Sequence, residues 1–340
     1  MKKIMFFRPL FYIGGTEIAI LNLIKKLHGF EIYIGYTDES SSQDVLDNYS
    51  NYAKVVKVDE NFNEELDVLI LCSPNKKALE INDIIKRKRT ILWFHYFGSK
   101  ENAIFTDERF YSVVDTIITV SQTTKNMLLA KEYGPRIKDK IEVIYNVMDV
   151  EDILNKSEEK INLDLSHKLT LVSVGRVCYE KGMGRQIELA KYLIKHNIDF
   201  KWYIVGGNYY AEKEMEIKKQ CEKLGDYFVF TGFVDNPFNI IKQCDYLVLL
   251  SDTETWGLVI TEAKILGVPC IVTDFEAAYE QIKDNENGLI LSREDTTSYD
   301  NKIDLILNNK HKYKENLSKF KWSNDDILKD WTNILNKGGI

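Results

Sequence analysis

The stretch YLVLLSDTETWGLVITEAKILG, residues 246–267, contains an apolar strand, a polar loop and a helix in direct succession. The strand is predicted over Tyr246 to Leu250, and the helix runs on to Gly267. In α/β proteins, ligands bind at such strand ends. The first N–H groups of a helix lack intrahelical partners and carry a partial positive charge, which suits a diphosphate. Glu254 in the loop and Glu262 in the helix would then serve different parts of one ligand.

The same pattern of apolar runs separated by helical stretches recurs along the chain, which indicates parallel sheets wound with helices. Strands are predicted in the first half near residues 3–7, 31–36, 54–58, 67–72, 90–95, 115–120 and 142–145. The pattern restarts in the second half, with strands near residues 169–174, 201–205, 227–231, 246–250, 269–272 and 288–291. The fold class is therefore α/β, with two doubly wound Rossmann-like domains.

We expect an N-terminal domain over residues 1–150, a polar linker over residues 151–168 and a C-terminal domain over residues 169–318. Residues 319–340 are expected to form a helix that packs on either domain. Two such sheets facing each other would place a ligand in the cleft between them.

Composition excludes several classes of protein. A net charge of −7 argues against binding to nucleic acid, and no apolar run approaches the length of a membrane span. The five cysteines form no C-x-x-C pair, so they are expected to be reduced thiols in a cytoplasmic protein. The first residues predict a buried strand instead of a signal peptide.

Two glycine-containing loops are candidate phosphate or substrate sites. Gly14 and Gly15 lie between a strand and a helix, where backbone can approach a ligand, although a simple glycine turn explains them equally well. In the loop GRVCYEKG, Arg176 and Lys181 can grip adjacent phosphates; a solvated loop is the alternative. No G-x-G-x-x-G is present, which argues against a nicotinamide dehydrogenase.

His95 ends a very apolar strand, where a side chain tends to face a ligand, and a satisfied core histidine is the alternative. Aromatic residues that would suit a sugar ring or a lipid follow it: Tyr96, Phe97, Phe105, Phe110 and Tyr111. Metal-binding motifs, including D-x-D and H-E-x-x-H, are absent from the sequence, so we expect chemistry without a metal ion.

The basic run from Lys86 to Arg89 is predicted to end a helix, where cations favour the helix dipole. A solvated helix end is one interpretation. A peripheral contact with anionic lipid headgroups is the other.

Three segments in order resemble the retaining GT-B glycosyltransferases of family four, the glycosyl transferases group 1. They are Gly175-Arg176 with Glu180-Lys181-Gly182, then Thr231-Gly232-Phe233-Val234-Asp235, then Glu254-x7-Glu262-Ala263 with Gly267-x-Pro269. The match covers roughly residues 170–290 and extends weakly to Gly14, Gly15 and Asn146. Thr255-Trp256 and Val147-Met148 depart from the family pattern.

The resemblance implies catalytic roles for Arg176, Lys181, Glu254 and His95. Arg176 and Lys181 would hold the donor diphosphate, whereas Glu254 and His95 would contact the transferred sugar.

The resemblance also implies a set of donor-binding residues in the glycine loops and near the helix start. Glu262 would take the ribose hydroxyls, and Phe233 and Val234 would border the base. The others are Gly14, Gly15, Gly206, Trp256, Gly257, Leu258 and Val259.

The expected function is the retaining, metal-independent transfer of a hexose or N-acetylhexosamine, with no cofactor. The donor would be a nucleotide sugar, with UDP expected, and the acceptor a saccharide or lipid-linked saccharide of cell-surface polysaccharide synthesis at the inner membrane face. A GT-B sugar-nucleotide epimerase or hydrolase and a catalytically silent nucleotide-sugar-binding subunit are the alternatives.

Overall fold

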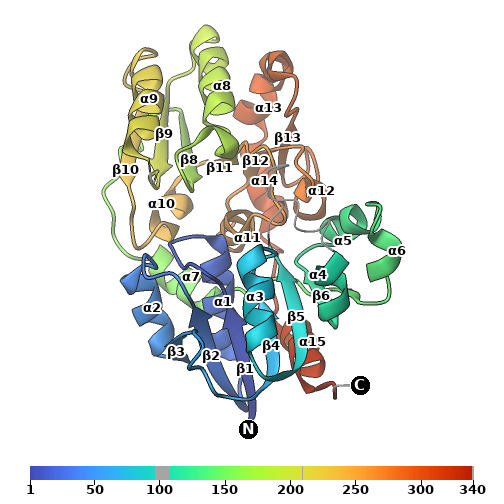
Figure 1. The fold of residues 1–340 in the computed structure, drawn as a ribbon. Helices are drawn as coiled ribbons and strands as arrows, with labels where there is room; N and C mark the ends of the chain where they lie inside the picture. The colour runs from blue at the N-terminus through green and yellow to red at the C-terminus, as the bar shows by residue number, and fades with distance from the viewer. Residues whose placement is uncertain (96–107, 209, 339–340) are drawn as a thin grey trace. The chain divides into compact units, whose positions relative to one another are not determined.

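A computed structural model describes residues 1–95, 108–208 and 210–338 of the chain. The chain forms two compact units, one of Met1–Met148 with Ser323–Ile340 and one of Asp149–Trp322. Each unit is a parallel sheet with helices on its faces (Figure 1), so the predicted α/β class with two doubly wound units is confirmed. The expected facing of the two sheets stays a prediction.

The first unit contains a seven-stranded parallel sheet in the order β3-β2-β1-β4-β5-β6-β7. Its central strands carry consecutive apolar residues because helices cover both faces. The strand order reverses between β1 and β4, and ligands of such sheets bind at the carboxyl ends beside that point. The strands are β1 (Lys2–Phe7), β2 (Phe30–Tyr36), β3 (Lys54–Lys57), β4 (Leu66–Leu71), β5 (Arg87–Phe94), β6 (Thr116–Thr119) and β7 (Ile141–Val143).

Helices connect these strands, and the sequence predicts three of them, near residues 16–27, 75–86 and 122–132. They are α1 (Gly15–Lys26), α2 (Gln43–Ser50), α3 (Lys76–Ile84), α4 (Glu108–Val113), α5 (Gln122–Leu129) and α6 (Gly134–Ile137). The polar helix α2 was not expected from the sequence; it buries only Leu46 and Tyr49.

The second unit contains a six-stranded parallel sheet in the order β10-β9-β8-β11-β12-β13. Its strands are β8 (Leu169–Val174), β9 (Phe200–Val205), β10 (Phe228–Gly232), β11 (Tyr246–Leu249), β12 (Cys270–Thr273) and β13 (Gly288–Leu291). Its helices are α7 (Val150–Ser157), α8 (Met183–Lys195), α9 (Ala211–Glu222), α10 (Phe238–Gln243), α11 (Leu258–Ile265), α12 (Ala278–Gln281), α13 (Ile303–Asn308) and α14 (Lys310–Leu317).

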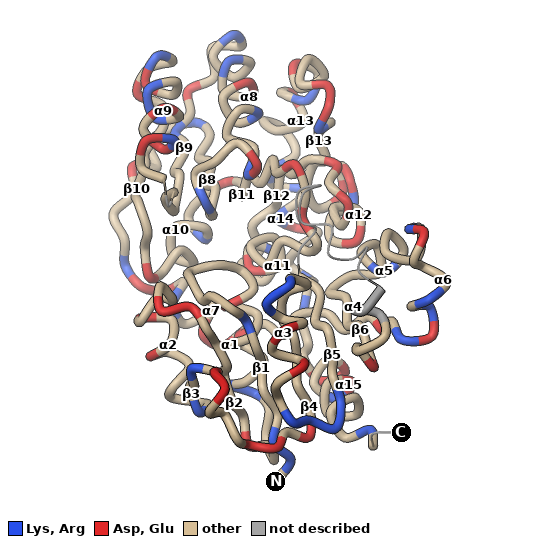
Figure 2. Tube along the Cα trace, viewed as in Figure 1, with Lys and Arg blue, Asp and Glu red and all other residues tan. Residues whose placement is uncertain are grey.

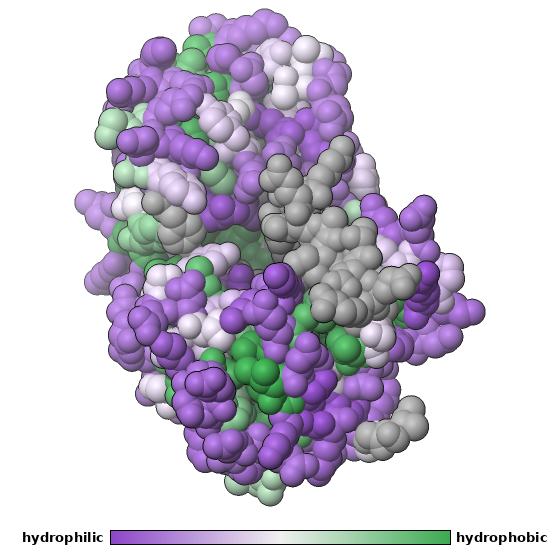
Figure 3. All heavy atoms as spheres, viewed as in Figure 1, coloured by the Kyte–Doolittle hydropathy of each residue, from purple (hydrophilic) through white to green (hydrophobic). Residues whose placement is uncertain are grey.

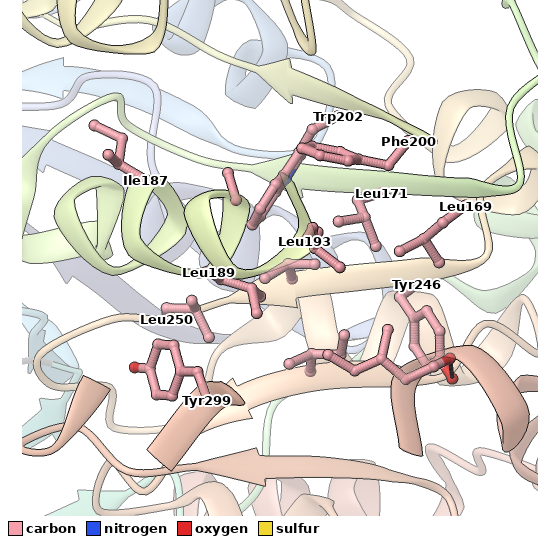
Figure 4. Packing of buried hydrophobic residues seen from close by; sticks show 14 of the residues in the cluster. Leu169, Leu171, Ile187, Leu189, Leu193, Phe200, Trp202, Tyr246, Leu250 and Tyr299 are labelled. Atoms are coloured by element: carbon pink, nitrogen blue, oxygen red, sulfur yellow. Dashed lines mark hydrogen bonds between the residues drawn. The ribbon is translucent and has the colours of Figure 1, made fainter. Parts of the chain in front are cut away.

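Large side chains between α8 and the sheet form the core of the second unit (Figure 4). Trp202 on β9 is fully buried, and its indole N–H donates to Ser173 Oγ on β8 at 3.0 Å. The Tyr246 hydroxyl on β11 donates to the carbonyl of Ile306 at 2.8 Å. Both polar groups are therefore satisfied inside the core, which fixes the strands that carry the candidate site.

A helix occupies part of the segment that we expected to be a linker. Helix α7 buries Ile153 and Ser157 and packs against α10 and α11, so it belongs to the second unit. Its composition is polar because it buries only one narrow face.

The basic run does not end a helix, contrary to our expectation. Helix α3 ends at Ile84, and residues 87–89 begin β5, where Figure 2 shows them in blue. Lys88 pairs with Asp67 at 2.8 Å, and Arg89 is only 7% exposed. Arg89 is therefore unavailable to a lipid surface.

The C-terminal helix α15 (Asp325–Asn336) packs on the first unit, where our expectation had left both units open. The Trp331 ring lies 4.7 Å from that of Trp93 on β5. Arg89 donates from Nη1 to the carbonyls of Ile334 at 2.8 Å and Lys337 at 3.0 Å. These cationic bonds satisfy carbonyl groups that a helix end leaves without partners.

The viewed face of both units is mostly hydrophilic, with hydrophobic patches on the first unit (Figure 3). Within the described ranges, no helix is both long enough and apolar enough to cross a bilayer. The five cysteines are free thiols, as expected.

Candidate active site

Glycines at the carboxyl ends of neighbouring strands let the loops of the second unit approach one another closely. Gly182 has a φ of +82°, and a Cβ there would lie 1.9 Å from the Leu250 carbonyl oxygen. Gly206 has a φ of +124°, and a Cβ there would lie 2.1 Å from the Gly175 carbonyl oxygen. No other residue type fits these positions, because both the backbone angle and the space favour glycine.

The loops that carry Lys181 and Glu254, which are far apart in the sequence, lie in contact. Lys181 Nζ lies 2.5 Å from Glu254 Oε1, which also accepts a hydrogen bond from Ser251 Oγ at 2.9 Å. The Asp252 N–H donates to the Glu180 carbonyl at 2.8 Å, so backbone joins the two loops as well. The structure therefore places a cation and a carboxylate together at the end of β11.

Arg176 lies in the same glycine-bounded loop as Lys181. Its Nη2 is 3.2 Å from Glu180 Oε2, and its side chain is 40% exposed. Arg176 and Lys181 line one small hollow with Gln186 and Leu249. Two cations of different shape thus lie beside one strand end, which suits a diphosphate.

The start of α11 follows Glu254 directly. Gly257 has a φ of +78° and precedes the helix, whose first N–H groups, at Leu258 and Val259, lie at its positive end. The Trp256 indole is 5% exposed and donates to Thr261 Oγ1 at 3.0 Å. Trp256 thus anchors the loop with its buried ring, a role that the sequence did not indicate.

Glu262 is a buried carboxyl group on α11, with 7% of its surface exposed. No described residue donates a hydrogen bond to this carboxyl. Burial raises the pKa of Glu262 to about 7. The group is therefore ready to accept hydrogen bonds from a ligand that reaches it.

Phe233 and Val234 follow β10, and they are 55% and 36% exposed. A Cβ at Gly207 would lie 2.8 Å from the Phe233 ring, so the ring rests beside glycine backbone. The Gly206 N–H donates to the Gly232 carbonyl at 2.8 Å, which joins the ends of β9 and β10. An exposed aromatic ring of this kind offers a stacking surface for a base.

In the first unit, Gly14 and Gly15 lie between β1 and α1, and His95 follows β5. A Cβ at Gly14 would lie 2.9 Å from Glu17 Oε2. Glu17 is buried and forms an ion pair with Arg8, which the sequence reasoning missed. A cation directly after the first strand and a carboxylate in the first turn of the next helix were the available signal.

Burial, and then the Arg8 guanidinium of the same ion pair, lower the pKa of the candidate histidine, His95, to about 3. Its ring lies 4.3 Å from the Trp93 ring. His95 is thus a neutral donor or acceptor at ordinary pH and not a cation.

Some of the expected aromatic residues do not contribute to a site. Phe110 is 1% exposed in the core of the first unit, so the acceptor role expected for it is wrong. Tyr96, Phe97 and Phe105 lie outside the described residues, as does the side chain of Tyr111. Over the described ranges, no group of three or more His, Cys, Asp or Glu residues is placed to hold a metal ion.

Comparison with known proteins identifies similar sequences. The family model described as glycosyl transferases group 1 matches residues 155–321. An uncharacterized glycosyltransferase of Methanocaldococcus jannaschii is 29% identical over 227 residues, which cover 63% of this chain and 51% of that protein.

A second relative is named for a specific sugar transfer. The UDP-Gal:alpha-D-GlcNAc-diphosphoundecaprenol alpha-1,3-galactosyltransferase of Escherichia coli is 29% identical over 185 residues, covering 50% of this chain and 46% of that protein. The chain thus spans about half the length of these two relatives.

Among solved structures, HepE of Anabaena in complex with UDP and glucose has a TM-score of 0.80 to this chain. The alignment covers 99% of this chain and 100% of that one at 18% identity. At this identity the likeness concerns the fold.

Proposed function

We propose that the chain is a retaining, metal-independent hexosyltransferase of the glycosyl transferases group 1 family, because that family's model matches residues 155–321 and the chain has the GT-B fold. In the proposed reaction, a hexose or N-acetylhexosamine moves from a UDP-sugar to a hydroxyl group of a saccharide or lipid-linked saccharide. The E. coli relative, whose name contains UDP-Gal and a diphosphoundecaprenol-linked GlcNAc, supports both the donor and the acceptor class.

The contact between Lys181 and Glu254 carries this proposal. It joins the diphosphate-type loop after β8 to the acidic loop after β11, directly before the start of α11. A donor diphosphate bound there meets Arg176, Lys181 and the first N–H groups of the helix. Glu254 then accepts hydrogen bonds from the sugar, and Glu262 from the ribose.

During transfer, the bond between the anomeric carbon and the phosphate oxygen breaks, and negative charge develops on the leaving diphosphate. Fixed cations and helix N–H groups stabilise that charge without needing to reorganise. The acceptor hydroxyl gives its proton to the leaving phosphate oxygen on the same face of the sugar and forms the new glycosidic bond. The configuration is retained without a protein nucleophile.

Donor identity is tested by thermal unfolding with UDP-, GDP- and ADP-sugars, since a ligand that binds the folded state raises its stability by mass action. We expect stabilisation by UDP-sugars above the other two. Equal stabilisation by all three, or by none, contradicts the donor assignment.

Arg176 and Lys181, which we call the phosphate clamp, are tested by replacing each cation. Lys181→Ala and Arg176→Ala are each expected to lower kcat by about a hundredfold, because each removes charge stabilisation in the transition state. Lys191→Ala is the matched control, since Lys191 lies on α8 in an exposed pair with Glu188. Near-normal kcat in both clamp variants would sink the assignment.

Two further assays separate the proposal from its alternatives. Transfer in EDTA equal to transfer in magnesium is expected, and complete loss in EDTA contradicts metal independence. A GT-B epimerase or hydrolase consumes donor without acceptor, whereas the proposed transferase forms product only when an acceptor is present.

The proposed place of action is the cytoplasmic face of a membrane, where a lipid-linked acceptor is presented. Co-sedimentation with anionic vesicles tests this proposal, with neutral vesicles as the control. The proposed contact is with anionic lipid headgroups. Equal sedimentation with both vesicle types, or with neither, contradicts it.

A further inference from the structure

Arg185 is an unusual cation for its position. It is the third residue of α8, near the positive end of that helix, where a cation is unfavourable unless it has partners. Its Nη2 lies 2.6 Å from Asp252 Oδ1, and its Nη1 donates to the Leu250 carbonyl at 3.2 Å. Its Nε donates to the Arg293 carbonyl at 2.9 Å.

A second arginine, which follows the Asp252 loop in the sequence, contacts the same loop. Arg293 follows β13, and its Nη1 donates to the Asp252 carbonyl at 2.5 Å. The same nitrogen lies 3.1 Å from Glu276 Oε1, while Glu276 Oε2 accepts a hydrogen bond from Thr253 Oγ1 at 2.9 Å.

These contacts hold the polypeptide on both sides of Asp252, two residues before Glu254. The Arg185, Arg293 and Glu276 side chains are 18%, 28% and 20% exposed, whereas the Asp252 side chain is 47% exposed and partly open to solvent. Charge-assisted hydrogen bonds of the arginine side chains to carbonyl and carboxylate groups are strong and directional. We call Arg185, Arg293, Asp252 and Glu276 the arginine brace.

We propose that the arginine brace is a positioning device that holds the loop so that Glu254 meets the transferred sugar in the reactive geometry. This inference rests on the proposed function and adds residues that do not touch the donor. The brace links the first turn of α8, the end of β11 and the loops after β12 and β13. Four separate elements therefore fix the position of one carboxylate, that of Glu254.

The expected consequence is a loss of rate without a matching loss of nucleotide binding. A displacement of about 1 Å at a reacting centre is enough to cost on the order of a hundredfold in rate. The diphosphate and the base are bound by other residues, so the affinity for UDP remains.

The experiment measures kcat, the Kd for UDP and the thermal midpoint of Arg185→Met and Asp252→Asn. Both are expected to lower kcat at least tenfold, with the Kd for UDP changed less than twofold. Asp252→Asn keeps the shape of its side chain, so it tests the brace even if Arg185→Met does not fold. Lys195→Met is the control, because Lys195 lies at the other end of α8 in an exposed pair with Asp300.

A double-mutant cycle with Glu254→Gln identifies the residue through which the brace acts. In the Glu254→Gln background, Asp252→Asn is expected to lower kcat by less than twofold further, because the carboxylate that it positions is already gone. A full multiplicative loss in that background overturns the inference, as does unchanged kcat in both single variants. Full transfer by Glu254→Gln alone instead overturns the role of Glu254 in the proposed function.

Discussion

Replacing Glu262 with glutamine is expected to stabilise the ligand-free protein in neutral and alkaline solution. The carboxyl group is 7% exposed and receives no hydrogen bond from a described residue. Burial raises its pKa from 4.5 to about 7, a difference that corresponds to about 3 kcal/mol. Glutamine has nearly the same shape and never ionises, so it avoids this cost.

The direction of the pH dependence follows from the two pKa values. Below pH 4.5, Glu262 is protonated in both the folded and the unfolded chain, and it contributes no difference. Between pH 4.5 and about 7, only the unfolded chain loses the proton, so the stability of the wild-type protein falls as pH rises. Above about pH 7 the full cost of about 3 kcal/mol is present.

The assay is urea unfolding of wild type and Glu262→Gln at pH 5, 6, 7 and 8. The advantage of the variant is expected to grow across this range and to level off above pH 7. Glu222→Gln, on the exposed surface of α9, is the control and is expected to change stability by less than about 0.5 kcal/mol throughout. An advantage that does not change with pH refutes the buried-carboxyl reasoning.

Nucleotide binding provides a second readout for the same residue. Ribose hydroxyls that donate to the carboxylate favour its charged form, so binding of UDP at pH 6.5 is expected to release a proton. Calorimetry in buffers of different ionisation enthalpy measures this release. The variant is expected to bind UDP more weakly and to release no proton. Equal release by both proteins contradicts the ribose assignment.

Three further predictions concern other buried polar groups. Arg89→Met is expected to lower stability by about 2 kcal/mol in urea titration, because it leaves the buried Ile334 carbonyl at the end of α15 without its partner. Lys88→Met breaks an exposed pair and is expected to cost less than about 1 kcal/mol in the same titration. Gln186→Leu is expected to raise stability by about 1 kcal/mol in that titration, since Gln186 Oε1 is buried with no hydrogen-bond partner among the described residues. His95 is neutral well above its pKa of about 3, so it is not expected to ionise near pH 6.5. The pH profiles of kcat/KM for wild type and His95→Gln are therefore expected to have the same shape near that pH. An ionisation near pH 6.5 that is present in wild type and absent from His95→Gln would contradict this.

The sequence was sufficient to predict the sheets because their strands are buried on both faces. Continuous apolar runs, such as the one around Leu69 or Val248, leave little alternative to a central parallel strand. Helices α2 and α7 were missed because they bury few residues, so their sequences are polar. Their formation depends on packing against distant elements, which a local pattern does not contain.

The run at Lys86–Arg89 was misinterpreted for a related reason. One of its cations, Arg89, does cap a helix, but that helix is α15, about 245 residues further along the chain. In the candidate site, Lys181 and Glu254 belong to motifs visible in the sequence. Arg185 and Arg293 belong to none, because their importance comes from a loop that only the fold brings to them.

The position of α15 has a consequence for how the chain is made. Residues 149–322 form the second unit as one uninterrupted segment, whereas the first unit needs residues from both ends. A ribosome therefore delivers every residue of the second unit before it delivers α15. N-terminal domains usually fold first during synthesis. Here the second unit has all of its residues before the first unit does. Until α15 arrives, the apolar surface around Trp93 lacks the cover that Trp331 provides in the folded chain.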